Sequence, residues 1–312
     1  MKKKLVMIVG PTAVGKTRVS VETAKLLDTE VISADAMQIY IGMNIGTAKI
    51  REDEKQGIPH HMIDLVYPDE KFTVSDFKTQ SGAIIEQLHL NDKIPVIAGG
   101  TGLYINSLIY KLNFSNTISD DRVRSELNQL LETKGKVTLH RMLESIDPIA
   151  AGKIHVNNAK RVMRALEVYH ITGRPFSASN TDFRDESDDY HFVLIGLEMD
   201  RQLLYNRIDQ RVDDMVSNGL IDEVMVLRAQ GYGRNLTSMQ GIGYKEIMQY
   251  LDHEITLEES VRIMKRNTRR LAKRQFTWFK ADNRIKWIHV DPINIDQTLK
   301  DVQNYLSERG IL

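Results

Sequence analysis

The stretch Gly10–Thr17 constrains the fold of this chain more than any other feature of the sequence. It reads Gly-Pro-Thr-Ala-Val-Gly-Lys-Thr and matches the phosphate-binding pattern G-x-x-x-x-G-K-[ST]. The apolar run Leu5–Val9 predicts a buried strand before the loop, and the residues after Lys16 predict a helix that ends at Leu27. Loop N–H groups and a helix N-terminus attract anions, and the lysine adds a full positive charge. We therefore predict a di- or triphosphate site formed by Gly10, Pro11, Thr12, Ala13, Val14, Gly15, Lys16 and Thr17. The Thr17 hydroxyl is the predicted Mg²⁺ ligand.

Short apolar segments alternate with helical patterns on both sides of a helical middle region. Strands are predicted at residues 31–33, 95–98, 191–197 and 286–290, with a further short strand after Pro59. Alternating strands and helices are typical of a parallel sheet covered by helices, so the fold class is α/β. Residues 115–187 show only helical spacing, with helices expected at 120–132, 137–146 and 159–171. We predict a core of residues 1–114 and 188–312 with an all-helical insertion domain at 115–187, and a polar linker at 181–189.

Asp35 is the acidic residue that the sequence places beside the phosphate loop. It follows the strand at residues 31–33, and the carboxyl ends of parallel strands meet at one edge of a sheet, where ligands bind. A carboxylate at that position can be a Mg²⁺ ligand, a general base or a structural cap.

Charge is distributed unevenly along a chain whose 42 basic and 42 acidic residues balance. Between Arg262 and Lys286 there are ten Lys or Arg residues and a single acid, Asp282. Seven of the basic residues form two adjacent rows at i,i+4 spacing on the helix expected from Thr256 to Lys280. The rows are a solvated helix face or a surface for a polyanion; further basic residues in the insertion (Arg122, Arg124, Lys160, Arg161, Arg164) favour a nucleic acid.

Some other residues whose type could suggest a functional role are explained more simply by an ordinary structural role. His60 and His61 lack a second histidine pair at ligand spacing, so we interpret them as loop histidines and not as a metal site. Phe276, Trp278 and Phe279 are interpreted as the core-facing stripe of the basic helix. The chain contains no cysteine and no apolar run near the ~18 residues of a membrane span. We expect a cytoplasmic monomer that does not bind membranes.

Several motifs, taken in order, resemble the tRNA dimethylallyltransferase family, also called tRNA isopentenyltransferases, over nearly the whole chain. They are residues 10–17, Ser33-Ala-Asp-Ala-Met-Gln-Ile-Tyr40, Ile45-Gly-Thr-Ala-Lys49, Gly99-Gly-Thr-Gly-Leu-Tyr104, Gly241-Ile-Gly-Tyr-Lys245 and Leu271-Ala-Lys-Arg-Gln-Phe-Thr-Trp-Phe279. The phosphate loop alone is common to many proteins, whereas the combination is specific.

The resemblance implies transfer of a dimethylallyl group from dimethylallyl diphosphate to N6 of the adenosine 3′-adjacent to the anticodon, position 37, in tRNAs reading UNN codons. It implies Mg²⁺ as cofactor, a P-loop kinase-like core, and an insertion that grips the anticodon stem-loop. Thr12 and Lys16 would act on the diphosphate, and Asp35 would accept the proton of the attacking amine. Contacts to tRNA are implied for Asp35, Ala36, Met37, Gln38, Thr101, Arg124, Lys160, Arg161, Val162, Met163, Arg164, Lys273, Arg274 and Gln275.

Three positions depart from the family pattern. Ala36 and Asn44 stand where many members have Ser and Asp, and we expect both changes to be neutral. Gln240 stands where some relatives have a diphosphate-binding arginine, so that role is not assigned to it.

Two other classes of protein share parts of the pattern. A small-molecule or nucleoside kinase would use the same loop for ATP and the insertion as a lid, but would leave the basic face from Arg262 to Lys286 unexplained. An RNA-binding protein with a regulatory phosphate loop would explain the charge and leave Asp35 without a role.

Overall fold

The protein consists of two compact units, each with its own core. The computed structural model describes residues 2–111, 120–178 and 189–312. One unit comprises Met1–Ile109 with Asp188–Leu312, and the other comprises Tyr110–Ser187. The boundary predicted at residue 114 and most of the linker predicted at 181–189 lie outside the described residues.

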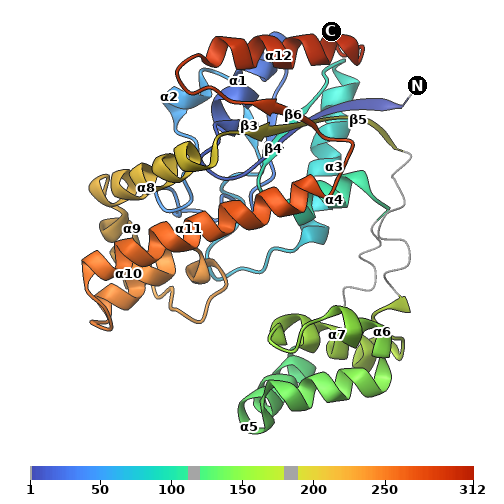
Figure 1. Cartoon of the computed structure of the whole chain (residues 1–312), viewed down its shortest axis with the longest axis vertical. Helices are drawn as coiled ribbons and strands as arrows, with labels where there is room; N and C mark the ends of the chain where they lie inside the picture. Colours follow the sequence, from blue (N-terminus) through green and yellow to red (C-terminus); the bar gives the residue numbers. More distant parts are fainter. Residues whose placement is uncertain (1, 112–119, 179–188) are drawn as a thin grey trace. The chain divides into compact units, whose positions relative to one another are not determined.

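The larger unit is built on a six-stranded sheet whose neighbouring strands are all parallel (Figure 1). The order is β3-β2-β4-β1-β5-β6. The strands are β1 (Lys3–Val9), β2 (Val31–Ser33), β3 (His60–His61), β4 (Val96–Gly99), β5 (Tyr190–Glu198) and β6 (Lys286–His289). Leu5–Val9 are all fully buried, because β1 has a strand on each side and helices over both faces. The predicted parallel sheet flanked by helices is confirmed.

Helices lie on both faces of this sheet. Figure 1 shows α1 (Lys16–Leu26) and α12 (Ile295–Glu308) on one face, and α3 (Val74–Leu90) and α4 (Gly102–Ile109) on the other. A capping box is present at the start of α3, since the Thr73 hydroxyl accepts from the Asp76 N–H and the Asp76 carboxylate accepts from the Thr73 N–H. A four-residue helix, α2 (Glu52–Lys55), was not predicted, because it is too short to show a period.

A second apolar cluster lies under the loop that follows β2. It is formed by residues of that loop and of α8 (Arg201–Ser217), α9 (Leu220–Ala229), α10 (Tyr244–Leu251) and α11 (Leu257–Lys280), with the 3₁₀ turn Ser238–Gln240. Ile39 and Met43 of the loop pack with Tyr244, and all three are fully buried. The loop after Asp35, which the sequence left unassigned, is therefore an ordered part of the core.

The smaller unit is helical over its described residues, as predicted. Its elements are α5 (Asp121–Ile146), α6 (Pro148–Lys153) and α7 (Ala159–Thr172). The break predicted between two helices in residues 120–146 corresponds to Gly135, whose backbone is non-helical inside α5 (φ 75°, ψ 169°). The helix predicted at 159–171 is α7; the Asn158 side chain caps it and Gly173 ends it with φ 66°, whereas α6 was not predicted.

Within the described ranges, no helix is long and apolar enough to span a bilayer.

Candidate functional site

The phosphate loop joins β1 to α1 at the carboxyl edge of the sheet. Ala13 (φ 65°) and Gly15 (φ 108°) have left-handed backbones, which turn the loop toward the N-terminus of α1. A Cβ atom on Gly10 would lie 2.7 Å from the Leu197 carbonyl oxygen of β5, so a side chain is excluded there. The loop therefore has the conformation and helix start that bind phosphate groups.

The Lys16 side chain lies across this loop, and its surroundings shift its pKa. Its Nζ donates to the carbonyl oxygens of Gly10 (2.9 Å) and Pro11 (2.8 Å). Burial lowers the pKa of Lys16 to about 8; the Asp35 carboxylate opposes this shift and the Arg211 guanidinium adds to it. An anion bound in the loop would compete with the two carbonyl oxygens for Nζ and favour the charged form of the lysine.

A cavity of about 60 Å³ begins at Lys16 and Thr17 and extends toward β2 and β3. Asp35 also lines it, so the structure brings the predicted anion-binding lysine and the predicted base to one cavity. The Asp35 carboxylate accepts a 2.9 Å hydrogen bond from the Met37 N–H, which fixes its orientation at the start of the loop. The lining residues are Lys16, Thr17, Ser20, Val31, Ser33, Asp35, Gln38, Ile50, His60, Ile63, Ala98 and Gly99.

Other predicted site residues lie along the same sheet edge. The Thr101 hydroxyl accepts a 3.0 Å hydrogen bond from the Ala36 N–H, which ties the end of β4 to the loop after β2. The Gln38 side chain accepts from the Ser33 hydroxyl at 3.0 Å. These contacts hold several of the predicted tRNA-contacting residues in fixed positions at the sheet edge.

Gln275 of α11 bonds to two loops at the carboxyl edge of the sheet, the phosphate loop and the loop after β4. Its side-chain oxygen accepts from the Thr12 N–H (2.8 Å), and its amide nitrogen donates to the Gly100 carbonyl oxygen (3.1 Å). We predicted Gln275 as an RNA contact, whereas here both ends of its amide are bonded to the core. The basic helix is thereby fixed to the phosphate loop.

Two arginines of α8 belong to this site and were missed from the sequence. Arg207 Nε donates to the Ala13 carbonyl oxygen of the phosphate loop at 3.0 Å. Arg211 is close enough to Lys16 to lower the pKa of that lysine, and burial together with Arg207 lowers the pKa of Arg211 itself. Their spacing of four on a helix directly after a core strand was the available signal. Clustered cations of this kind fit a polyphosphate.

The basic rows of α11 differ in their partners, which corrects the expectation that they form one face for a polyanion. Lys265 and Arg269 form ion pairs with Asp213 and Asp209 of α8. The acids lie some fifty to sixty residues earlier, so the helix spacing alone could not reveal these pairs. Arg270, Lys273 and Arg274 are exposed, and no ion pair engages them within the part of the chain that the structure describes. The surface available to an anion is therefore this second group.

In the helical unit, some side chains that we predicted to contact RNA are instead used in ion pairs and packing within the unit. Arg124 and Arg164 both pair with Glu167, which is only 2% exposed, at 2.9 Å and 2.7 Å. Val162 is fully buried in the core of the unit, so its side chain cannot contact RNA, contrary to our prediction. Lys160 and Arg161 at the start of α7 are exposed, and Met163 is half-buried.

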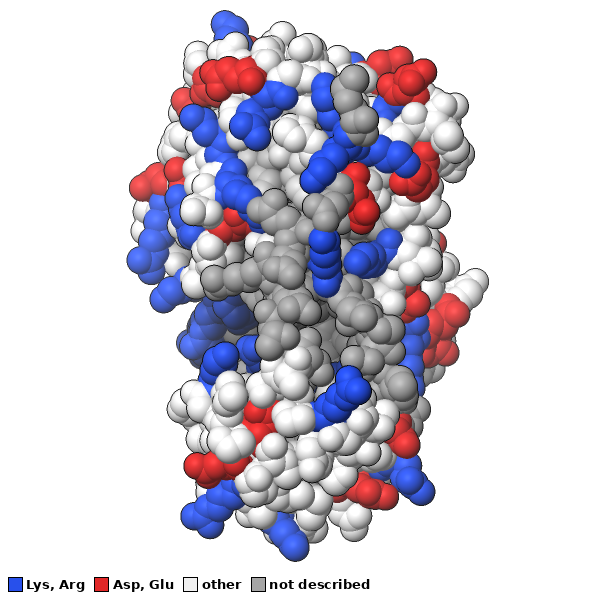
Figure 2. All heavy atoms as spheres, turned by 90° about the vertical axis from the view of Figure 1, so that its right-hand side faces the viewer, with Lys and Arg blue, Asp and Glu red and all other residues white. Residues whose placement is uncertain are grey.

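The aromatic residues of α11 do not all face the core. Phe279 is buried, but the Trp278 side chain is 46% exposed, so the prediction was wrong for Trp278. A tryptophan on this side of the helix packs beside α4, since a Cβ on Gly102 would lie 2.3 Å from its ring. Elsewhere, on the face drawn in Figure 2, basic and acidic side chains are interspersed.

The oxygen atoms at the site suit Mg²⁺, which needs few protein ligands. They do not suit a metal ion whose ligands all come from the protein. Among the described residues, no three His, Cys, Asp or Glu side chains gather as a metal-binding group. Thr17 is exposed at the cavity and offers a hydroxyl oxygen, and Mg²⁺ is commonly held by few protein ligands together with substrate phosphates and water. His60 Nδ1 bonds to the Ile58 carbonyl and His61 Nε2 to Glu30, so both side chains are engaged within the fold; the two residues form the short strand β3 and not the loop we expected.

Comparison with known proteins gives one consistent family. The profile of the family described as IPP transferase matches residues 38–282, and that of isopentenyl transferase matches residues 3–65. A tRNA dimethylallyltransferase of Acetivibrio thermocellus is 49% identical over 308 residues, covering 98% of each chain. The crystal structure of the full-length tRNA isopentenylpyrophosphate transferase from Bacillus halodurans has 45% identity and a TM-score of 0.72, with 99% of this chain and 98% of that chain covered. A eukaryotic dimethylallyltransferase acting on tRNA has 30% identity and a TM-score of 0.82, with 99% and 79% covered. With one profile spanning most of the sequence and relatives this similar over their full length, the chain belongs to the tRNA dimethylallyltransferase family.

Proposed function

We propose that this protein transfers the dimethylallyl group of dimethylallyl diphosphate to N6 of adenosine 37 in tRNAs that read UNN codons. The products are N6-isopentenyladenosine and diphosphate. The observation that carries the proposal is that Lys16, Thr17 and Asp35 line a single cavity, so a leaving diphosphate and an attacking amine can be bound side by side.

Stabilisation of the leaving group is the first requirement of this reaction. The exocyclic amine of adenine is a weak nucleophile, so the C1–O bond of the donor must break as diphosphate departs. Lys16, with Arg207 and Arg211 on α8, supplies positive charge where negative charge develops. Mg²⁺ bound with the diphosphate and held by Thr17 would supply further positive charge to the leaving group.

Removal of a proton from the attacking nitrogen is the second requirement. As the N6–C1 bond forms, N6 becomes positively charged and loses a proton. Asp35 is positioned to accept it, because its carboxylate faces the cavity and is oriented by the Met37 N–H. The adenine must leave its stack in the anticodon loop to reach this carboxylate.

Binding of the RNA draws on exposed cations in each unit. Arg270, Lys273 and Arg274 on α11, and Lys160 and Arg161 on α7, are exposed and fit phosphate groups of an anticodon stem-loop. Such contacts position an RNA without reading its sequence.

A labelled-donor experiment tests the proposal. Purified protein is mixed with unmodified tRNA and either labelled dimethylallyl diphosphate or labelled ATP, and a tRNA with guanosine at position 37 is the control. We expect label from dimethylallyl diphosphate to enter only the RNA with adenosine 37. Transfer from ATP to a small acceptor, with none from dimethylallyl diphosphate, would show a kinase and overturn the proposal.

A further inference from the structure

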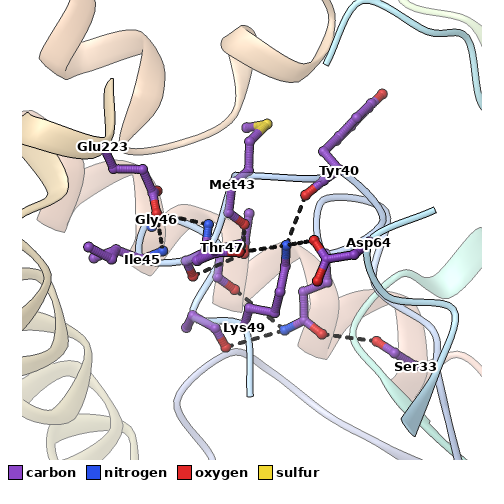
Figure 3. A network of polar contacts seen from close by, with 12 residues as sticks. Ser33, Tyr40, Met43, Ile45, Gly46, Thr47, Lys49, Asp64 and Glu223 are labelled. Carbon is purple, nitrogen blue, oxygen red and sulfur yellow. Dashed lines mark hydrogen bonds and ion pairs between the residues drawn. The ribbon is translucent and has the colours of Figure 1, made fainter. Parts of the chain in front are cut away.

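Lys49, from one of the family motifs without an assigned role, is a buried cation whose hydrogen-bonding capacity is fully used. Its side chain is only 6% exposed. Nζ donates to the Tyr40 carbonyl oxygen (2.8 Å), to Asn44 Oδ1 (2.9 Å) and to the Asp64 carboxylate (Figure 3). An ammonium has three donors, so Lys49 has none left for a substrate phosphate. Burial lowers its pKa, and Asp64 and Glu223 oppose that shift.

The loop that contains Lys49 is also fixed from the opposite side by α9 and α10. The Glu223 carboxylate accepts from three successive N–H groups, those of Asn44 (2.9 Å), Ile45 (2.8 Å) and Gly46 (3.2 Å), as Figure 3 shows. The Tyr244 hydroxyl donates to the same carboxylate at 2.6 Å. Gly46 lies so close to the Tyr244 ring that a Cβ would be 2.5 Å from it, which requires glycine there. The motifs around Gly46 and Tyr244 thus form one rigid contact.

The Lys49–Asp64 ion pair joins the two segments that wall the cavity. Ile50 follows Lys49, Ile63 precedes Asp64, and both isoleucines line the cavity while remaining only half-buried. Left-handed backbones surround them at non-glycine residues: Ala48 (φ 48°), Met62 (φ 62°) and Asp64 (φ 53°). Strain of this kind persists only where the surrounding contacts enforce it, and it is concentrated at functional sites.

The far part of the cavity is apolar once the internal hydrogen bonds are made. Val31 and Ala98 of the sheet line it together with Ile50 and Ile63. The Gln38 amide, which could have bound a base, instead donates to the carbonyl oxygens of residues 47 and 48 (3.4 Å and 3.3 Å) and accepts from a serine hydroxyl. His60 contributes a ring whose pKa is lowered by burial, so it is neutral at physiological pH.

The size of the cavity indicates a short hydrocarbon. A water-sized sphere takes roughly 10–15 Å³ of such space, so the whole cavity of about 60 Å³, including its end at Lys16 and Thr17, has room for only about four to six of them and is too small for a long hydrocarbon. A dimethylallyl group has five carbon atoms. Its diphosphate would lie at Lys16 and Thr17, where the same cavity begins.

We infer that Ile50 and Ile63 select the length of the donor hydrocarbon, and that Lys49 and Asp64 are positioning residues that hold this wall in place. The inference rests on the proposed function, since it assigns the cavity to the hydrocarbon of a prenyl diphosphate. On this inference, the wall limits the hydrocarbon to about five carbons and disfavours a geranyl chain of ten. Loss of the ion pair lets the two segments relax and opens the end of the cavity.

The test compares two donors with the same RNA acceptor. kcat/KM is measured for dimethylallyl diphosphate and geranyl diphosphate in the wild-type protein, Ile50→Ala, Ile63→Ala and Lys49→Met. We expect the preference for the shorter donor to fall by about 10- to 200-fold in the alanine variants, the range for methylene groups in an apolar pocket. Lys49→Met should shift the preference in the same direction. Lys3→Met, which breaks the exposed Lys3–Glu86 ion pair, is the matched control and should leave the preference unchanged.

The donor preference is a ratio, so a merely destabilised variant lowers both rates and leaves it unchanged. Should Lys49→Met fail to fold, Ile50→Val and Ile63→Val each remove a single methylene and measure the same preference. An unchanged ratio in the cavity variants, or a raised KM for tRNA alone because adenine occupies the end of the cavity at Ile50 and Ile63, overturns the inference and leaves the proposed function standing. A wild-type protein that transfers nothing from dimethylallyl diphosphate overturns both.

Discussion

The N–H of Thr12 donates a 2.8 Å hydrogen bond to the side-chain oxygen of Gln275, a residue 263 positions later in the chain. The same amide donates to Gly100, so one side chain of α11 holds the phosphate loop and the loop after β4 together. The helix that presents Arg270 and Arg274 to solvent is therefore in direct contact with the anion site.

Gln275→Glu should weaken donor binding while leaving the fold intact. A carboxylate can still accept from Thr12, but it cannot donate to Gly100 and it places a negative charge beside the diphosphate. We expect KM for dimethylallyl diphosphate to rise by about tenfold or more, equivalent to about 1.4 kcal/mol, with a small change in Tm. Gln303→Glu on the exposed side of α12 is the control. Equal KM values for Gln275→Glu and the control would show that the amide bridge does not affect the donor.

Donor binding should weaken as pH rises above the lowered pKa of Lys16. In the free protein this pKa is about 8 instead of 10.5, so the lysine becomes neutral above pH 8 and must regain a proton when the diphosphate binds. The Kd should be flat below pH 8 and then rise by up to about tenfold per pH unit. Calorimetric titration of dimethylallyl diphosphate, whose phosphates do not ionise further in this range, measures the curve.

Lys16→Ala provides the control for this pH dependence. The variant should bind the donor weakly at every pH and show no break near pH 8. A break that persists in Lys16→Ala would assign the titration to another group.

Asp35→Asn separates the roles open to this carboxylate. The amide keeps the shape of the side chain and cannot take the proton, so turnover should fall by roughly 10²- to 10⁴-fold with little change in tRNA affinity. Single-turnover rates measured across a Mg²⁺ titration check this expectation. A rate that recovers with excess Mg²⁺ would make Asp35 a metal ligand, and a loss of Tm at a normal rate would make it a structural cap.

Neighbouring arginines of α11 should have different effects when removed. Arg270→Ala and Arg274→Ala should weaken tRNA binding and reduce the slope of log K against log salt by about one each, because each phosphate contact releases counterions. Arg269→Ala breaks the ion pair with Asp209, so it should lower Tm and leave the salt slope nearly unchanged. Filter binding at several salt concentrations measures the slopes. Identical slopes for all three variants would refute the division of the helix into paired and RNA-binding cations.

Features encoded within a few residues could be predicted from the sequence. The phosphate loop, the cap at Thr73 and the end of α7 at Gly173 each depend on local conformation, and all three are present. Asp35 was placed correctly because parallel strands bring their carboxyl ends to one edge.

Features that depend on long-range pairing could not be predicted. Glu223 bonds to the loop at residues 44–46 across about 180 positions of sequence, and nothing local marks it. Arg207 reaches Ala13 across 194 positions. Helix periodicity predicted the rows of cations on α11, but it could not show that two of these cations, Lys265 and Arg269, are paired with acids of α8.

The position of β1 between β4 and β5 has a consequence for how the chain folds during synthesis. β1 is made first, β4 follows within the first hundred residues, and β5 is made only after the whole helical unit. Until Glu198 has left the ribosome, the nascent sheet keeps one side of its most buried strand as an open, apolar edge. We therefore expect chains truncated before β5 to aggregate or bind chaperones, and the helical unit to fold while the sheet around β1 is still incomplete.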